Sequence, residues 1–152
     1  MLEKKLAEMK LVLPEIPVSS ASFVGYKRSG NLIYISGQLP LKDGKPTLIG
    51  RLGDDVSIDD AYVAAQQCTL NVLAQLKLAL DGNWERVVQI VRVGGFVRCT
   101  GDFGDAAKVV NGASDLLVRL FGAAGSHARA AIGVASLPLN VAVEIEATIE
   151  IS

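Results

Sequence analysis

The C-terminal stretch from Ser126 to Ile151 constrains the fold more than any other part of this chain. It holds two apolar runs on either side of a Leu-Pro pair, and in the second run hydrophobic and polar residues alternate. This period-two pattern is typical of a strand with one buried face. One face of that strand would carry Ala142, Glu144, Glu146, Thr148 and Glu150, and the other Val141, Val143, Ile145, Ala147 and Ile149. Arg129 and Glu144 are charges inside these runs and need an explanation.

Three segments have the apolar spacing of helices. The clearest covers residues 57–80, where Ser57 can cap the first turn and Asp60 stands at the capping-box position. Residues 105–121 carry a second apolar stripe. Residues 2–13 predict a short N-terminal helix that ends before two prolines.

Strands are predicted between these helices. The segment NLIYISG, from Asn31, is rich in β-branched and aromatic residues, which favour a strand. A weaker strand candidate covers residues 21–27, and the residues between the two, Arg28-Ser29-Gly30-Asn31, are typical of a hairpin turn. A short strand is expected around Leu48. Residues 87–98 form another strand, interrupted by Gly94-Gly95. Such glycines indicate a bulge or a close approach to the backbone, and the bulge is the favoured interpretation.

The order of these elements predicts a single α+β domain over residues 1–152, in which residues 1–17 form a helical arm. Both long helices would cover one face of a mixed sheet. We expect the other face to be too apolar to face water, because Ile33, Ile35, Val91, Val93 and the final strand supply alternating hydrophobic residues on both sides of the sheet. Exposed apolar surface favours association, so the sequence predicts a homo-oligomer.

Composition excludes several classes of protein. Fifteen basic and sixteen acidic residues give a net charge of −1, which argues against a general nucleic-acid binder but allows a small anionic ligand. Cys68, Cys99 and the single histidine, His127, form neither a disulfide framework nor a metal motif, and Cys68 is expected in the core. The chain has no apolar run of the ~20 residues that span a membrane and no signal-peptide pattern, so we expect a soluble cytoplasmic protein.

Two residues could carry chemistry. A guanidinium at Arg129 matches a carboxylate bidentately, although a surface arginine or a structural ion pair would fit the pattern too. Glu144 could orient a water or take a proton, or it could belong to a solvated polar face. His127 lies two residues before Arg129 and could reach the same site, or it could be incidental.

The run ARAAIGVASLPLNVAVEIEATI resembles the signature of the RidA family, also called YjgF. In that signature an arginine opens a strand, Leu-Pro follows, and a V/I-E-I-E-A strand closes the chain. The fifteen-position spacing from Arg129 to Glu144 equals the family spacing. The segment GNLIYISGQLPL from Gly30 and the pair Val110-Asn111 also fall in register, and the resemblance covers residues 18–151.

The resemblance implies a chorismate-mutase-like fold and a homotrimer with a central barrel and ligand clefts between subunits. It implies hydrolysis of reactive 2-imino or 2-enamino acids to 2-keto acids and ammonia, without metal or organic cofactor. Arg129 would bind the substrate carboxylate, and Glu144 would be the catalytic residue. The other residues expected to contact substrate are Phe23, Ser36, Gly37, Gly94 and Asn111.

The sequence departs from the family pattern at several places, which include an extra N-terminal helical arm and a longer loop around Gly50-Arg51-Leu52-Gly53. Phe23 stands where a tyrosine is usual, so a hydroxyl that could touch substrate or water is missing. Ala131 replaces a frequent cysteine, and Gly94-Gly95 would enlarge the pocket. These departures keep open a non-catalytic trimer that binds small carboxylates. Ribonuclease activity is a weaker alternative, because there is no basic stripe and no histidine pair.

Overall fold

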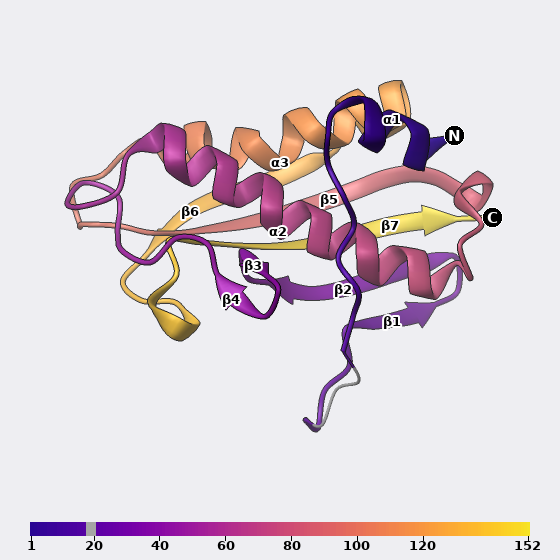
Figure 1. The fold of residues 1–152 in the computed structure, drawn as a ribbon, viewed down its shortest axis with the longest axis horizontal. Coiled ribbons are helices and arrows are strands. Elements are labelled where there is room, and N and C mark those ends of the chain that lie inside the picture. Colours follow the sequence, from indigo (N-terminus) through magenta and orange to yellow (C-terminus); the bar gives the residue numbers. More distant parts are fainter. Residues whose placement is uncertain (18–20) are drawn as a thin grey trace.

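Two long helices lie side by side on one face of a five-stranded mixed sheet (Figure 1). The computed structural model describes residues 1–17 and 21–152. The elements are α1 (Leu2–Glu8), β1 (Tyr26–Ser29), β2 (Leu32–Gln38), β3 (Leu41–Lys42), β4 (Lys45–Pro46), α2 (Ile58–Ala79), η1 (Trp84–Arg86), β5 (Val87–Arg98), α3 (Ala106–Phe121), η2 (Gly122–Gly125), β6 (Ala128–Val134), η3 (Pro138–Asn140) and β7 (Val143–Ile151). The sheet order is β1-β2-β7-β5-β6, in which only β5 and β6 run parallel. The predicted α+β class is confirmed.

β7 is the central strand, and its burial alternates as the sequence pattern predicts. Ile145, Ile149 and Ile151 are each 1% exposed beneath the helices, whereas the polar residues between them are only half-buried. A central strand whose alternation survives in the fold has one packed face and one face open to solvent or to a partner. One face of β7 therefore belongs to the core, and the other carries Glu144 and the other polar residues of the strand.

The boundaries of α2 follow from local capping. The Ser57 side chain accepts a hydrogen bond from the Asp60 amide at 3.1 Å, which satisfies one of the unpaired donors of the first turn. Asp81 (φ +50°) and Gly82 (φ +77°) turn the chain away after the last helical residue. Cys68, in the middle of α2, is fully buried, as predicted for a core residue.

The N-terminal helix is shorter than the sequence predicts. α1 ends at Glu8, because Lys10 takes a left-handed conformation (φ +57°) and the Leu11 amide donates back to the Leu6 carbonyl. This six-to-one bond closes a Schellman motif, which a non-glycine residue adopts here. The apolar stripe continues past the helix because Leu11 and Leu13 still pack against the core from an extended segment.

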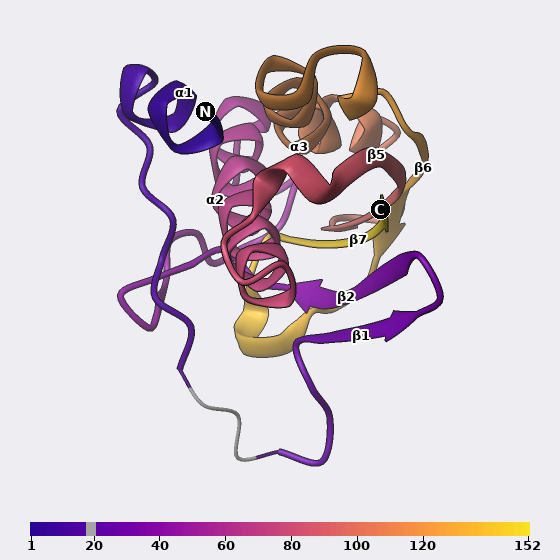
Figure 2. The same ribbon diagram turned by 90° about the vertical axis from the view of Figure 1, so that its right-hand side faces the viewer.

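The arm is tied to the helical layer (Figure 2). Leu2 and Leu6 are buried, the Lys5 ammonium donates to the Leu120 carbonyl at the end of α3 (2.8 Å), and Lys77 pairs with Glu3 at 2.6 Å. A cation at a helix C-terminus satisfies an unpaired carbonyl and complements the helix dipole. Residues 1–9 therefore extend the helical layer.

Leu6→Ala is expected to lower the free energy of unfolding by about 2 kcal/mol, the low end for a buried leucine because a short terminal helix can adjust. Leu6 is 3% exposed. Urea denaturation measures the change, and Leu78→Ala on the exposed side of α2 (50% exposed) is the control. Equal stabilities of the two variants would show that the arm is not packed in solution.

Two strand predictions need correction. The predicted strand at residues 21–27 begins only at Tyr26, because residues 21–25 do not pair with β2 as a ladder. Near Leu48 there is only an isolated bridge from Ile49 to Val141. The hairpin between β1 and β2 is confirmed, with Gly30 at φ +60° in its two-residue turn.

The predicted bulge at Gly94-Gly95 is wrong. β5 shifts register near Val88 and Val91, whereas both glycines pair regularly with β7. The alternative of a close approach is correct. A Cβ at Gly95 would overlap the side chain of Val110 on α3, so glycine here lets the helix lie close to the sheet.

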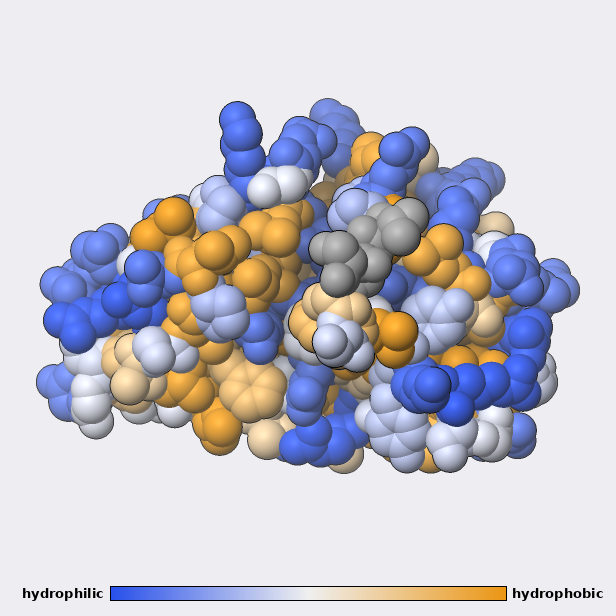
Figure 3. Space-filling model, turned by 90° about the horizontal axis from the view of Figure 1, so that it is seen from below, coloured by the Kyte–Doolittle hydropathy of each residue, from blue (hydrophilic) through white to orange (hydrophobic). Residues whose placement is uncertain are grey.

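The open face of the sheet differs from the prediction. Ile33, Ile35 and Val93 are buried on the helix side and do not reach the open face. Seen from below, hydrophobic residues gather on one part of the molecule and hydrophilic ones surround them (Figure 3). Ile132 on β6 is 48% exposed, whereas β7 contributes its glutamates and Thr148. The predicted homo-oligomer therefore cannot rest on a uniformly apolar face and stays a prediction.

Candidate functional site

Glu144 lies on the open face of β7 against the second strand of the sheet. The ladder between β2 and β7 shifts register between Ile35 and Gln38, and Gly37 lies in this irregular segment. A Cβ on Gly37 would come within 2.7 Å of the Glu144 Oε2 atom. Glycine at position 37 therefore leaves room for the carboxylate beside the β2 backbone. The structure thus brings Gly37 close to Glu144, and the roles of Glu144, Ser36 and Gly37 in a substrate site stay a prediction.

The pKa of Glu144 is raised above the usual value for glutamate. Partial burial disfavours the charged form, and the neighbouring Glu146 adds like-charge repulsion. Among the described residues, no hydrogen bond or ion pair to the Glu144 carboxylate compensates for this. A carboxylate in this state takes up a proton more readily than a fully solvated glutamate does.

Glu146, the second glutamate on this face, points toward β5, the neighbour of β7 on the side opposite β2. A Cβ on Gly94 would come within 2.6 Å of the Glu146 Oε1 atom, and that atom lies 3.5 Å from Arg92 Nη1. Glu146 therefore fills the space beside Gly94. The prediction that Gly94-Gly95 enlarges a pocket is wrong, because Glu146 and Val110 occupy the space that side chains there would take.

Glu144→Gln is expected to stabilise the folded protein at neutral pH. The raised folded-state pKa means that the folded state binds more protons than the unfolded state between the two pKa values. The free energy of unfolding of the wild type therefore falls as pH rises through that window, and the glutamine variant escapes this loss. The difference is expected to vanish below about pH 4, where the carboxylate is protonated in both states.

Thermal unfolding from about pH 3 to pH 8 measures this difference. Glu150→Gln, on the same face, shows how much a glutamate-to-glutamine change alters stability by itself. A Glu144→Gln variant less stable than the wild type at pH 7 would mean that a favourable partner holds the carboxylate in solution.

Ser36 anchors the chain segment that carries Phe23. Its hydroxyl donates to the Val24 carbonyl at 2.6 Å, and its amide donates to the Gly25 carbonyl at 2.9 Å. Phe23 is 68% exposed and, with Ser36, borders a concavity of about 480 Å³ on the open face. Phe23 therefore stands at the edge of the Glu144 side of the sheet, and its substrate contact stays a prediction.

Arg129 lies on the opposite side of the sheet from Glu144. In the ladders Arg129 pairs with Val93, which in turn pairs with Ala147, and both partners are buried beneath the helices. The guanidinium reaches α3, where Nη1 donates to Ser114 Oγ (3.0 Å) and Nη2 to the Ala107 carbonyl (3.3 Å). One chain therefore does not bring the two charges together.

The Arg129 side has its own neighbours. Ala107, Asn111 and Ser114 follow at four and three residues along α3, so they share one stripe of the helix. His127 Nε2 lies 2.9 Å from Ser114 Oγ, which confirms that it reaches the same place as Arg129. Sequence reasoning missed Ser114, although its helical spacing from the predicted Asn111 was a usable signal.

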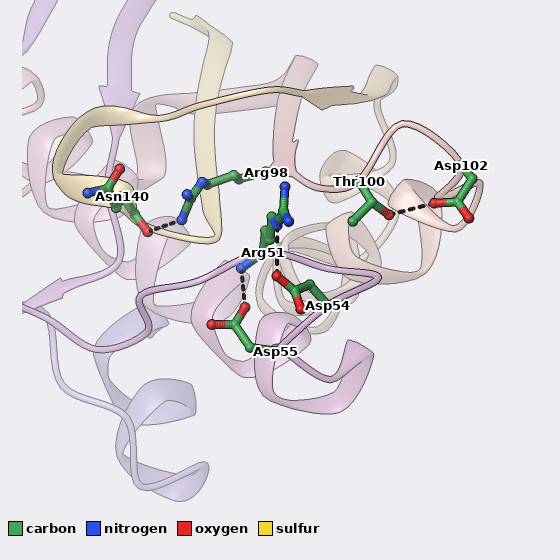
Figure 4. Close-up of polar contacts among 7 residues, drawn as sticks. All are labelled: Arg51, Asp54, Asp55, Arg98, Thr100, Asp102 and Asn140. Carbon is green, nitrogen blue, oxygen red and sulfur yellow. Dashed lines mark hydrogen bonds and ion pairs between the residues drawn. The ribbon is translucent and has the colours of Figure 1, made fainter.

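A second group of polar contacts lies at the end of β5 (Figure 4). The Arg51 amide and Nε donate to Asp55 and Asp54, both at 2.9 Å, and Arg98 Nη1 donates to the Asn140 carbonyl at 3.2 Å. The Arg51 amide is also the main reason that the pKa of Asp55 is lowered. Since these groups bind one another and the backbone, they close the long loop after β4 and are not part of the candidate site.

Two classes of site are not found in the described part of the chain. The acidic, histidine and cysteine side chains of residues 1–17 and 21–152 include no group of three that could hold a metal ion. Within the same ranges, no helix combines the length and apolarity needed to cross a membrane.

Comparison with known proteins identifies the family. Residues 3–150 match the family described as "YjgF/chorismate mutase-like, putative endoribonuclease". Protein TCP17 of Trypanosoma cruzi is 37% identical over 148 residues, which cover 97% of this chain and 92% of that protein.

Two solved structures show how the chain stands within this fold. The structure of Atu1372 from Agrobacterium tumefaciens superposes with a TM-score of 0.94 at 42% identity, covering 99% of this chain and 93% of that one. The structure of YjgF from E. coli gives a TM-score of 0.62 at 28% identity over 88% of this chain and 91% of that one. The fold is thus the YjgF/chorismate-mutase-like fold, and the chain belongs to the YjgF/RidA family.

Proposed function

We propose that this protein hydrolyses reactive 2-imino and 2-enamino acids to 2-keto acids and ammonia, in clefts between the subunits of a homotrimer. The observation that carries the proposal is the division of the charged groups between two faces. Arg129 is held on the helix side at the edge strand β6, whereas Glu144 lies on the open side of β7. A neighbouring chain that covers the β6 edge with its open face would join an Arg129 to a Glu144.

The Arg129 side supplies a carboxylate receptor. Of the five N–H donors of a guanidinium, one goes to Ser114 and one to the Ala107 carbonyl, so three remain. Two parallel N–H groups match the two oxygens of a carboxylate and select ligands that carry one. A 2-imino acid bound in this way presents its C=N carbon at a defined distance from the guanidinium.

The Glu144 side supplies the proton transfers. Water attacks the C=N carbon of the protonated imine while Glu144 accepts a proton from the water, which gives a neutral tetrahedral carbinolamine. Glu144 then returns this proton to the amino group. As the C–N bond breaks, the hydroxyl group releases its proton to solvent and becomes the carbonyl of the 2-keto acid, and ammonia leaves. The raised pKa of Glu144 brings its protonated and ionised forms closer in energy, which helps both transfers.

Hydrolysis by this route needs no strong catalyst. Imines react readily with water, so the protein gains rate mainly by holding the carboxylate and a water in a reactive arrangement. Ser36 and Gly37 would form the wall beside Glu144, and Asn111 would line the cleft beside Arg129. We place no metal or organic cofactor in this reaction and expect it in the cytoplasm.

A second candidate function is the binding of small carboxylates without turnover. Phe23 favours it, because a phenyl ring offers no hydroxyl to a substrate or water. Ribonuclease activity, which the family description names, has less support. A net charge of −1 leaves little general attraction for a phosphate backbone.

The test is the release of 2-keto acid from imines that an amino-acid oxidase generates in the reaction mixture. Wild-type protein is expected to accelerate release over buffer, and Glu144→Gln to lower kcat about a hundredfold. Glu150→Gln, which changes the same group elsewhere on this strand face, should retain activity. Saturable binding of 2-keto acids with no acceleration would favour the binding module, and equal activity of Glu144→Gln and the wild type would reject the role of Glu144.

A further inference from the structure

Arg129 is the first member of a chain of hydrogen bonds that ends on the backbone. Its Nη1 lies 3.0 Å from Ser114 Oγ, Ser114 Oγ lies 2.9 Å from His127 Nε2, and His127 Nδ1 lies 2.6 Å from the Gly125 carbonyl oxygen. The three side chains come from β6, from α3 and from the short loop before β6. They therefore join the edge strand to the helix that covers it.

The chemistry of the groups determines the direction of each bond. A carbonyl oxygen only accepts, so His127 Nδ1 carries the proton that faces Gly125. In the neutral imidazole Nε2 is then an acceptor, and the Ser114 hydroxyl donates a hydrogen bond to it. The lone pairs of Ser114 Oγ remain free to accept from Arg129. Each donor in this series of hydrogen bonds thus has an acceptor. All of the bonds run in one direction, from Arg129 through Ser114 and His127 to the Gly125 carbonyl.

The end of the chain is fixed in space. Gly125 is buried, and a Cβ at this position would overlap the carbonyl of Leu117 on α3. Since the backbone at Gly125 lies directly on the helix, its carbonyl oxygen holds His127 at a defined place relative to Ser114. Both supports of Arg129, Ser114 and the Ala107 carbonyl, also belong to α3.

We propose that Ser114 and His127 are positioning residues for Arg129, which hold its guanidinium in the orientation that receives the substrate carboxylate. The proposal rests on the proposed function of Arg129. An arginine side chain has many rotamers, and holding one of them before binding removes an entropic loss from the binding step. Without Ser114, the 3.3 Å bond to the Ala107 carbonyl is the remaining hydrogen bond to α3.

The expected signature is a change in binding rather than in chemistry. Ser114→Ala should raise KM for a 2-imino acid, and the Kd for the corresponding 2-keto acid, about tenfold. Its kcat should stay within about twofold, because Ser114 is proposed to act only through Arg129, which binds the carboxylate and not the reacting carbon. Ser114→Thr keeps the hydroxyl and should restore both constants. Ser126→Ala, an exposed serine in the neighbouring loop, is the matched control and should bind normally.

Steady-state kinetics and calorimetric titration with the 2-keto acid, carried out on the full chain, test the proposal. In the Arg129→Ala background Ser114→Ala should have no further effect on Kd, because the two residues act through one contact. His127→Ala breaks the same chain from the loop side and should also raise Kd, which keeps the test available where Ser114→Ala does not fold.

The outcomes separate this proposal from the proposed function. Loss of ligand binding in Arg129→Ala, with wild-type Kd in both Ser114→Ala and His127→Ala, would overturn the positioning role and leave the deaminase proposal standing. A further loss of affinity on adding Ser114→Ala to Arg129→Ala would also overturn the positioning role. It would show that Ser114 affects ligand binding by a route that does not involve Arg129. Wild-type binding in Arg129→Ala would instead reject the carboxylate receptor itself.

Discussion

Arg129→Ala is expected to lower kcat/KM for 2-imino acids about a hundredfold or more. The proposed contact consists of two charge-assisted hydrogen bonds, each contributing about 1.5–3 kcal/mol. Their combined loss of at least about 3 kcal/mol corresponds to two or more powers of ten. Most of the loss should appear in KM and in the Kd for 2-keto acids, because the carboxylate is bound in the ground state and in the transition state alike. Release of 2-keto acid in the oxidase-coupled assay measures it.

Arg119→Ala provides the control for this prediction. Arg119 is an exposed arginine in the last turn of α3, the helix that also supports Arg129, so it tests the loss of a positive charge in the same region. It should keep wild-type kcat/KM. Equal effects of the two variants would mean that general electrostatic attraction, and not a receptor at Arg129, draws the anionic substrate.

Mixing two inactive variants tests whether the site is shared between chains. When Arg129→Ala and Glu144→Gln subunits are unfolded, combined in equal amounts and refolded, about a quarter of the inter-subunit clefts would pair an intact Arg129 with an intact Glu144. Activity should therefore return to about a quarter of the wild-type value. No recovery in a mixed assembly of confirmed composition would show that Arg129 and Glu144 do not meet across an interface.

Gly112→Leu is expected to lower the free energy of unfolding by at least ~3 kcal/mol. A Cβ at Gly112 would overlap the carbonyl oxygen of Tyr62 on α2 and lie 3.1 Å from the Ala65 Cβ. A backbone carbonyl cannot rotate away, so α2 and α3 must separate. Leucine forms helices better than glycine by about 1 kcal/mol, and this gain is smaller than the packing loss. The melting temperature should fall by roughly 10 °C.

Gly101→Leu makes the same substitution where a Cβ would meet no atom within 4 Å. It should change the melting temperature by no more than about 2 °C, within the range of surface substitutions. Thermal unfolding followed by circular dichroism at equal protein concentration compares the two variants. Equal melting temperatures would mean that α2 and α3 do not approach this closely in solution.

Local signals were sufficient for the helices and for most of the sheet. Ser57 and the turn at Asp81-Gly82 delimit α2 through contacts within a few residues, so they act in the same way in any fold. The alternation in β7 likewise predicted its buried face. Lys10 escaped prediction because a lysine seldom takes a left-handed conformation, and here packing of Leu11 and Leu13 overrides that preference.

Contacts between distant segments could not be read in the same way. Gly94 and Gly95 look alike in the sequence, yet one accommodates Glu146 from the neighbouring strand and the other Val110 from the covering helix. The outcome depends on strand order and on how close α3 lies to the sheet. Neither quantity is encoded within a few residues of the glycines. The residues around Gly94 and Gly95 therefore contained nothing that argued against a bulge.

The sequence alone identified Arg129 and Glu144 as the two charges of interest, because strand periodicity and the family spacing are properties of a linear chain. The fold added that they lie on opposite faces of the sheet and that Ser114 and His127 support the arginine. The physical reason is that alternation along one strand shows only which of its own residues share a face. It does not show which side of the sheet that face lies on. Arg129 and Glu144 belong to different strands, and which of their faces coincide depends on the β5–β6 and β5–β7 registers formed only when the sheet assembles.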